Sequence, residues 1–314
     1  MASWQTYFVS AFLRLMVKNR LQHVSNIPEL RKQRDAKTRR LVPPPEARFI
    51  PGACPSLDGT ATLKLEWIHT PQVSTKRVIL YFHGGGYVAG SAQCYRDLTW
   101  RLGKAADADV AAVDYRLAPE HPCPAAIDDA EAAYRHLLEN GYAPKTITVA
   151  GDSAGGGLAM ALLLRLKAVN LPQPAAAIGL SPWVDLRLNS DALKRFKNTD
   201  VILNADDMVG IASHYLQGLD AASPDASPIM GDLSGLCPVM VHVGSKEILL
   251  DDATRLCSRI NDAGGDAQLK IWHNQPHIFQ LFSNVLPEGD QSIAELGQFV
   301  RQKTSNIRNC TKLS

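Results

Sequence analysis

The chain has 314 residues, of which 46% are apolar and 20% charged, and its formal net charge at pH 7 is +2. This length and composition suit one large globular α/β domain with insertions. So small a net charge gives no reason to expect nucleic acid or an anionic membrane as a partner. The cysteines show no C-x-x-C spacing, which argues against a disulfide scaffold or a zinc site and favours free thiols in a reducing cytoplasm: Cys54, Cys94, Cys123, Cys237, Cys257 and Cys310.

The N-terminal region is predicted to form helices that dock on the rest of the protein. Residues 4–17 are apolar-rich, but no basic residue precedes them, and Arg14 and Lys18 interrupt the run, unlike in a signal peptide or a transmembrane span. Helical spacing predicts that the docking face consists of Phe8, Phe12, Leu15 and Met16. Residues 20–45 are polar and basic, which predicts a solvated helix face, and their terminal triple proline should stop the helix.

From about residue 61 the chain alternates strands and helices. Short apolar, β-branched runs predict strands at 63–70, 77–83, 109–115, 146–150, 175–180, 238–244 and 268–272. Longer runs without breakers predict helices at 98–106, 125–139, 158–167, 253–263 and 292–302. Such repeated units imply a mostly parallel sheet wrapped by helices. The interval from Asp185 to Pro228 contains no strand candidate, and we interpret it as a cap over a cleft at the edge of the sheet.

A G-x-S-x-G motif lies between the strand at 146–150 and the following helix. Ser153 is its central residue, flanked by Gly151 and Gly155. A side chain at either glycine should collide with the adjoining backbone of so sharp a turn. The turn presents the serine hydroxyl to a cleft and places the N–H of Ala154 at a helix N-terminus, where it can donate to an oxyanion. The motif therefore predicts a nucleophilic serine.

A second glycine-rich loop, H-G-G-G-Y at 83–87, follows the strand at 77–83. Successive glycines let backbone N–H groups converge on one point, as the stabilisation of a negative oxygen requires. The alternative of a phosphate-binding loop lacks the G-x-G-x-x-G and G-x-x-x-x-G-K-[ST] patterns. The loop after the next strand, Asp114–Pro122, contains two prolines, an arginine and a glutamate, and is interpreted as a rigid scaffold in which His121 is structural.

A nucleophilic serine needs a base and an acid that orients the base. His273 and His277 follow the last predicted strand, where an α/β-hydrolase base belongs, and His277 is favoured because it adjoins a helix start. Their i, i+4 spacing suggests zinc, but Pro276 argues against a helix there. His242 lies in mid-strand and is expected in the core. The remaining histidines outside the motifs have no recognisable context: His23, His69, His136 and His214.

The acid is expected in the loop Gly244–Asp252, which follows a strand and precedes a helix. Glu247 comes first in this loop and is the preferred candidate, with Asp251 as the alternative. Asp251 and Asp252 also suit the first turn of a helix, where they face the positive end of its dipole. The order serine, acid, histidine along the chain is the one expected of an α/β-hydrolase.

Taken together, the motifs resemble those of hormone-sensitive-lipase-like (bacterial type IV) esterases, over about residues 61–300. They are H-G-G-G-Y, Y-R-L-A-P-E-H-P, G-D-S-A-G-G, E-I-L-L-D and P-H-I-F. The resemblance implies an α/β-hydrolase fold with a mostly parallel eight-stranded sheet, flanking helices and a helical cap. The family's acid motif usually reads D-x-L-x-D, so Glu247 is a departure that keeps Asp251 open. The implied site consists of the triad Ser153, Glu247 and His277, oxyanion-hole amides of Gly85, Gly86 and Ala154, and His83 as a support for the glycine loop.

The resemblance also implies a single domain. Its cap comprises residues 1–45 and about 186–228, and its core about 46–185 and 229–314. The implied activity is hydrolysis of short- to medium-chain acyl esters through an acyl-enzyme, with no metal or cofactor. The partners would be a small-molecule ester and a second copy paired through an edge strand, with no nucleic acid or membrane. The alternatives are hydrolysis of an amide, carbamate or lactam, and a non-catalytic small-molecule receptor, which the presence of His277 disfavours.

Overall fold

The computed structural model describes residues 2–15, 27–38, 46–70 and 76–304. In this part of the chain eight strands form a single sheet in the order β1-β2-β4-β3-β5-β6-β7-β8. Strands β3 to β8 run parallel, whereas β2 is antiparallel to both β1 and β4. The strands are β1 (Arg48–Pro55), β2 (Thr62–His69), β3 (Val78–Phe82), β4 (Asp109–Asp114), β5 (Ile147–Asp152), β6 (Ala176–Leu180), β7 (Val239–Gly244) and β8 (Ala267–Trp272).

The predicted strands are confirmed with shifts of one or two residues, and the sheet has one strand that the sequence pattern did not predict. Strand β1 contains Pro51, Gly52 and Pro55, residues that usually interrupt strands. It lies at the edge of the sheet and pairs only with β2 within the described chain, so a missing N–H on its outer side costs no ladder bond. Its place at the edge therefore explains why its composition is not strand-like.

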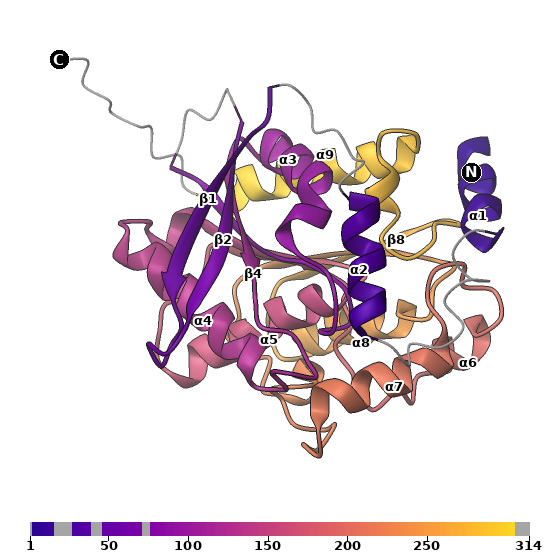
Figure 1. The fold of residues 1–314 in the computed structure, drawn as a ribbon. Coiled ribbons are helices and arrows are strands. Elements are labelled where there is room, and N and C mark those ends of the chain that lie inside the picture. The colour runs from indigo at the N-terminus through magenta and orange to yellow at the C-terminus, as the bar shows by residue number, and fades with distance from the viewer. Residues whose placement is uncertain (1, 16–26, 39–45, 71–75, 305–314) are drawn as a thin grey trace.

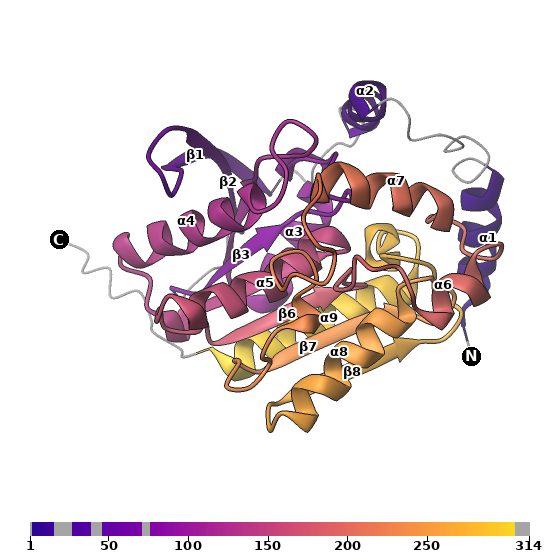
Figure 2. The same ribbon diagram turned by 90° about the horizontal axis from the view of Figure 1, so that it is seen from below.

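Helices cover both faces of the sheet (Figures 1 and 2). Helices α3 (Arg96–Ala106) and α9 (Pro287–Lys303) pack together on one face. The other face carries α4 (Ala125–Glu139), α5 (Ala154–Ala168) and α8 (Leu250–Asp262). The predicted helices are thus confirmed, although α3, α5, α8 and α9 begin two, four, three and five residues before the expected starts at 98, 158, 253 and 292. Proline at the first position of α9 is favourable, since its missing N–H would have no partner within the helix.

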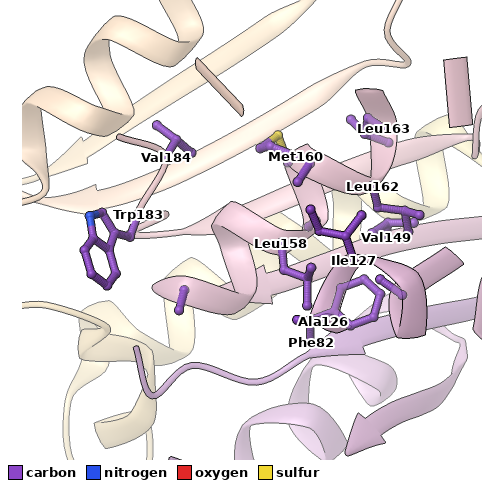
Figure 3. Packing of buried hydrophobic residues seen from close by; sticks show 14 of the residues in the cluster. Phe82, Ala126, Ile127, Val149, Leu158, Met160, Leu162, Leu163, Trp183 and Val184 are labelled. Carbon is purple, nitrogen blue, oxygen red and sulfur yellow. The ribbon is translucent and has the colours of Figure 1, made fainter. Parts of the chain in front are cut away.

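Alternate side chains of the central strands supply the two apolar layers. In β3, Leu80 and Phe82 point into the cluster beneath α4 and α5, whereas Ile79 and Tyr81 join the cluster beneath α3 and α9. Figure 3 shows part of the first cluster, in which Leu158 of α5 lies near Phe82. Because both faces are buried, these strands are apolar throughout, as a parallel sheet covered on two sides requires. The packing on both faces holds the strands in place, and the loops that follow their ends carry the candidate site.

The N-terminal helix α1 (Trp4–Leu13) docks on the protein as predicted, but with a different face. Val9 and Leu13 are buried and pack against Val201. Phe8 and Phe12 are 67% and 52% exposed, and so is Leu15 at 69%, so the predicted docking face was wrong. Met16 lies outside the described residues. Polar contacts select the face that docks: Ser3 binds the Glu288 carboxylate, and Thr6 accepts a hydrogen bond of 2.8 Å from Gln275.

The second N-terminal helix, α2 (Ile27–Thr38), is held by Arg31. The Arg31 guanidinium donates to the carbonyl oxygens of Val88 and Ala118 and pairs with Glu120 at 2.7 Å. In contrast to the predicted solvated face, this basic side chain therefore tethers α2 to the glycine loop and to the proline-containing loop. The latter loop is also anchored by a salt bridge of Arg116 with the buried Asp129, as expected of a scaffold.

The residues between Asp185 and Pro228 contain no strand, as predicted, and all of them belong to the described chain. They form α6 (Asp191–Phe196) and α7 (Ala205–Leu216) with connecting loops. In both views α1 and α6 lie at the end of the molecule opposite to α4 (Figures 1 and 2). Helix α7 contacts the glycine loop: the Cγ2 atom of Ile211 lies 2.6 Å from the position that a Cβ at Gly86 would take.

Candidate active site

Ser153 occupies a sharp turn between β5 and α5. Its backbone is strained, with φ at 52° and ψ at −121°, values that a residue with a side chain seldom adopts. The turn requires its glycines as expected: a Cβ at Gly151 would lie 2.2 Å from the Gly155 oxygen, and one at Gly155 would lie 2.0 Å from the Phe82 oxygen. The turn is fastened by a 2.9 Å hydrogen bond from the Ser153 N–H to the Leu180 oxygen at the end of β6. Ser153 thus has the geometry of a nucleophile elbow.

The glycine loop follows β3 and approaches the elbow. The N–H of Gly84 donates to the Asp152 carboxylate at 2.8 Å, so it is not available to a ligand. The next two glycines have positive φ angles, 129° at Gly85 and 66° at Gly86, a region in which a side chain is unfavourable. The N–H groups of Gly85 and Gly86, together with that of Ala154 at the start of α5, remain the candidate oxyanion donors.

His83 supports this loop from below. Its Nδ1 lies 2.9 Å from the Gly84 carbonyl oxygen, and its ring stacks on Tyr115 with centroids 4.4 Å apart. The Tyr115 hydroxyl in turn donates to the His83 carbonyl oxygen at 2.7 Å. These contacts place His83 in a supporting position, as the resemblance implied.

Asp152, the residue before the serine, links the elbow to the glycine loop. One oxygen of its fully buried carboxylate accepts hydrogen bonds from the Tyr81 hydroxyl and the Gly84 N–H, both at 2.8 Å. Burial raises the pKa of Asp152 to about 6, although these hydrogen bonds favour the charged form. Sequence reasoning gave this aspartate no role, because its partner Tyr81 is 71 residues away.

His277 and Glu247 form a buried pair in the loops after β8 and β7. The Nδ1 atom of His277 lies 2.6 Å from Glu247 Oε2, and both side chains are almost fully buried. The second carboxylate oxygen, Oε1, accepts hydrogen bonds from the Ser181 hydroxyl at 2.8 Å and the Gly244 N–H at 2.6 Å. These two hydrogen bonds hold the Glu247 carboxylate so that its Oε2 atom faces the imidazole. Because Nδ1 faces the carboxylate, Nε2 is the nitrogen left for a reacting group.

Ser181 is a further residue that sequence reasoning missed. It is fully buried after β6, and its backbone has a positive φ of 48°. Its hydroxyl donates to Glu247 and accepts the N–H of Ile278 at 3.3 Å, so it bridges the acid loop and the histidine loop. Ser181 does not belong to a recognisable motif. It could have been found only from its position directly after a strand, at the same edge of the sheet as Ser153.

Asp251, the alternative acid, and its neighbour Asp252 have different partners. Asp251 accepts a 2.6 Å hydrogen bond from the Ala192 N–H at the start of α6 and lies 3.5 Å from the Arg195 guanidinium. Asp252 is buried, and one of its oxygens accepts the N–H groups of Val184 and Asp185 at 3.0 Å each. Both residues lie in the first turn of α8, as predicted. The structure thus brings Glu247, and neither aspartate, into hydrogen-bond contact with His277.

Among the other histidines, His242 lies in the core, as predicted. His242 is buried in β7 beside the Ser292 hydroxyl, and burial lowers its pKa to about 3, so it is a neutral core residue. His273 and His121 are exposed. Among the described residues, His, Cys, Asp and Glu side chains do not form a group of three or more that could hold a metal ion. The described helices also include none that is both long and apolar enough to cross a membrane.

The fold and the strand-end loops define the class of the protein as an α/β-hydrolase. The family model described as "alpha/beta hydrolase fold" matches residues 79–281, and the chain belongs to this family. Among relatives, it is 44% identical over 239 residues to an acetyl-hydrolase of Streptomyces hygroscopicus, covering 76% of this chain and 80% of the relative. It is 38% identical to an esterase of Acinetobacter venetianus over 73% of this chain and 76% of the relative.

A solved structure that resembles the chain is the crystal structure of an esterase from the bacterial hormone-sensitive lipase family. The two share 37% identity with a TM-score of 0.89, over 97% of this chain and the whole of the other. A crystal structure of an esterase/lipase from an uncultured bacterium gives a TM-score of 0.90 at 35% identity, over 96% of this chain and 99% of that chain. The protein is therefore a carboxylic ester hydrolase of the hormone-sensitive-lipase-like group.

Proposed function

We propose that the protein hydrolyses short- to medium-chain acyl esters with Ser153 as nucleophile, His277 as base and Glu247 as the acid that orients it. The observation that carries the proposal is the 2.6 Å contact between His277 Nδ1 and Glu247 Oε2. The contact supports a tautomer with a proton on Nδ1, which would leave Nε2 to accept the proton of the serine hydroxyl. Asp251 is not given this role because its carboxylate binds Ala192 and Arg195 instead.

In the first half-reaction, the Ser153 hydroxyl attacks the ester carbonyl carbon while His277 Nε2 takes the hydroxyl proton. The carbonyl oxygen becomes negative and accepts hydrogen bonds from the N–H groups of Gly85, Gly86 and Ala154. Collapse of this intermediate breaks the bond to the alcohol oxygen, which takes the proton from His277 and leaves. Water then repeats the steps on the acyl-enzyme and releases the acid. Glu247 stays ionised throughout and stabilises the imidazolium form of His277.

The substrate range is inferred from what lies over the glycine loop. Helix α7 brings the Ile211 side chain against Gly86, and Tyr215 of the same helix stacks on Tyr87 with ring centroids 3.9 Å apart. An acyl group bound at the oxyanion site would therefore meet an apolar wall close to the reacting carbon. This wall favours short and medium chains over long ones.

We also propose that residues 186–228, with residues 1–45, act as the cap and that the remainder is the catalytic core.

Hydrolysis of a series of p-nitrophenyl esters, from acetate to palmitate, tests the proposal. We expect kcat/KM to be highest at short chains and activity to be lost in Ser153→Ala. Activity greatest on palmitate would contradict the proposed wall, and activity that survives Ser153→Ala would contradict the nucleophile. Inactivity of the folded wild type on every ester would favour an amide, carbamate or lactam as substrate, or a binding role.

Light scattering at micromolar concentration tests the predicted dimer, which a monomeric mass would contradict.

The described cysteines are free thiols, and this supports a reducing compartment for the protein: Cys54, Cys94, Cys123, Cys237 and Cys257.

A further inference from the structure

The segment between α6 and α7 carries a carboxylate, Asp200, that none of these steps uses. Asp200 is fully buried, and its N–H donates to the Phe196 carbonyl oxygen at 2.8 Å, which holds it against the end of α6. A buried carboxylate is unfavourable unless hydrogen bonds replace its lost hydration. Its contacts therefore show what the residue holds in place.

The two oxygens of Asp200 bind different parts of the protein. Oδ1 accepts the N–H groups of Ile202 and Leu203, both at 2.9 Å, and so shapes its own segment. Oδ2 accepts the N–H of Ile248 at 3.0 Å. Ile248 directly follows Glu247, so this hydrogen bond crosses from the α6–α7 segment to the acid loop. Moving Asp200 would pull on the backbone beside the Glu247 carboxylate.

The N-terminal helix completes this junction. Val201, next to Asp200, packs against Val9 and Leu13 of α1, with Ile202 and Phe282 at the border of the same cluster. Three elements far apart in the sequence thus meet around Asp200: α1, the α6–α7 segment and the acid loop. A buried charge at such a junction has a well-defined position relative to the acid loop.

The charge of Asp200 also acts on the candidate base. Burial raises the pKa of Asp200, the charge of His277 opposes this rise, and the charge of Glu247 adds to it. Glu247 contacts His277 directly, and the charge of His277 also acts on two further buried carboxylates, Asp200 and Asp152. Acylation converts His277 to an imidazolium, and nearby negative charges that are shielded from water favour that form.

We propose that Asp200 is a positioning residue, which fixes Glu247 through the Ile248 N–H and whose charge favours the imidazolium of His277. It touches neither the substrate nor the reacting atoms; it acts through the acid loop and through the field at the base. The assignment rests on the triad proposed above. It also gives α1 and the α6–α7 segment a physical connection to catalysis, through the packing around Val201.

The test is Asp200→Asn, which keeps the size of the side chain. The asparagine oxygen can accept either the Ile202 and Leu203 amides or the Ile248 amide, but not both sets, and in each case the negative charge is lost. We expect kcat to fall about tenfold to a hundredfold with KM little changed, as for a misplaced catalytic group. Since a lost negative charge lowers the pKa of the base, the acid limb of kcat/KM should move to lower pH, by about half a unit or more.

Asp251→Asn is the matched control. Asp251 likewise joins the α6 region to the core through a backbone amide, that of Ala192, but has no hydrogen bond to the Glu247–His277 pair. We expect it to retain the wild-type midpoint of the acid limb and a kcat within a few-fold. An unchanged midpoint and kcat in Asp200→Asn overturn the proposal. So does a loss confined to KM or to the melting temperature, since Asp200 would then only stabilise its segment.

If Asp200→Asn yields too little folded enzyme, Asp200→Glu provides the test, because it retains the charge and displaces the carboxylate. It should keep the wild-type midpoint with a lowered kcat, and a shifted midpoint overturns the proposal. The assays are run beside Ser153→Ala. If that variant stays active, the proposed triad and the role of Asp200 both fail. If it is inactive and Asp200→Asn behaves as wild type, only the role of Asp200 fails.

Discussion

Replacing Glu247 by glutamine is the most direct test of the proposed acid, and the structure fixes how the new side chain should lie. Glu247 Oε1 accepts two hydrogen bonds, from the Ser181 hydroxyl and the Gly244 N–H, at 2.8 and 2.6 Å. In Glu247→Gln the amide oxygen should stay with these two donors. The amide NH2 group then faces His277 Nδ1, where the carboxylate oxygen had been.

This reversal changes the tautomer of the base. An NH2 group donates, so Nδ1 of His277 must accept, and the single imidazole proton moves to Nε2, where it prevents removal of the Ser153 proton. The loss expected for a base held in the wrong tautomer is about 10⁴ in kcat, equivalent to about 5 kcal/mol of barrier. Because both hydrogen bonds at the amide oxygen are kept, the variant should remain folded.

The assay is steady-state hydrolysis of p-nitrophenyl acetate, with circular dichroism and the melting temperature as checks on folding. Asp251→Asn serves as control, and its kcat should stay within a few-fold of wild type. A folded Glu247→Gln enzyme whose kcat stays within tenfold of wild type would contradict the assignment of Glu247 as the acid. A collapse of Asp251→Asn in the same experiment would assign the acid to Asp251 instead.

Two further predictions concern the glycine loop and the pH dependence of stability. In Gly86→Ala the new Cβ would lie 2.6 Å from Ile211 Cγ2 at a φ of 66°, so the oxyanion loop should be displaced and kcat should fall about 10²- to 10³-fold. Gly210→Ala is the control, because the space around Gly210 is open. Equal kcat values in the two variants would contradict a role of Gly86 in the oxyanion hole. Burial raises the pKa of Asp252 to about 7, so the folded protein binds a proton there that the unfolded chain releases near pH 4, and stability falls as pH rises between these values. Asp252→Asn keeps an oxygen for both backbone amides. Measured by urea unfolding, its free energy of unfolding should rise relative to that of wild type by about 1–3 kcal/mol between pH 5 and pH 8. A difference between the two proteins that stays constant over this pH range would exclude the linkage.

Much of the fold and the nucleophile could be predicted because their determinants are local. The apolar, β-branched runs indicate buried strands wherever they occur, and a turn as tight as that at Ser153 needs its glycines within two residues of the serine. A side chain at Gly151 or Gly155 would collide with a backbone oxygen, at 2.2 Å and 2.0 Å respectively, and this steric limit is the physical reason for the motif. The spacing of the glycine loop, the serine, the acid loop and the final histidine then follows from the order of the strands.

Features that depend on contacts between residues far apart in the sequence were set by tertiary packing. Helical spacing identified α1, but its buried face depends on Gln275 and Glu288, which lie more than 260 residues further along the chain, and so Phe8 is exposed rather than buried. Strand β1 depends on its place at the sheet edge, not on its composition. The choice between two carboxylates four residues apart, Glu247 and Asp251, depends on which one the loop after β7 turns toward His277.

The buried polar residues around the site show the same limit. Asp152, Ser181 and Asp200 belong to residue types that are common on surfaces, and each has a hydrogen-bond partner that lies 48 to 71 residues away, namely Tyr81, Glu247 and Ile248. The alternation of strands and helices, the elbow and the family could all be recognised from local patterns of residues, since backbone sterics act over a few residues. The tertiary structure alone decided which carboxylates are buried beside His277, because burial and charge depend on neighbours that only folding brings together.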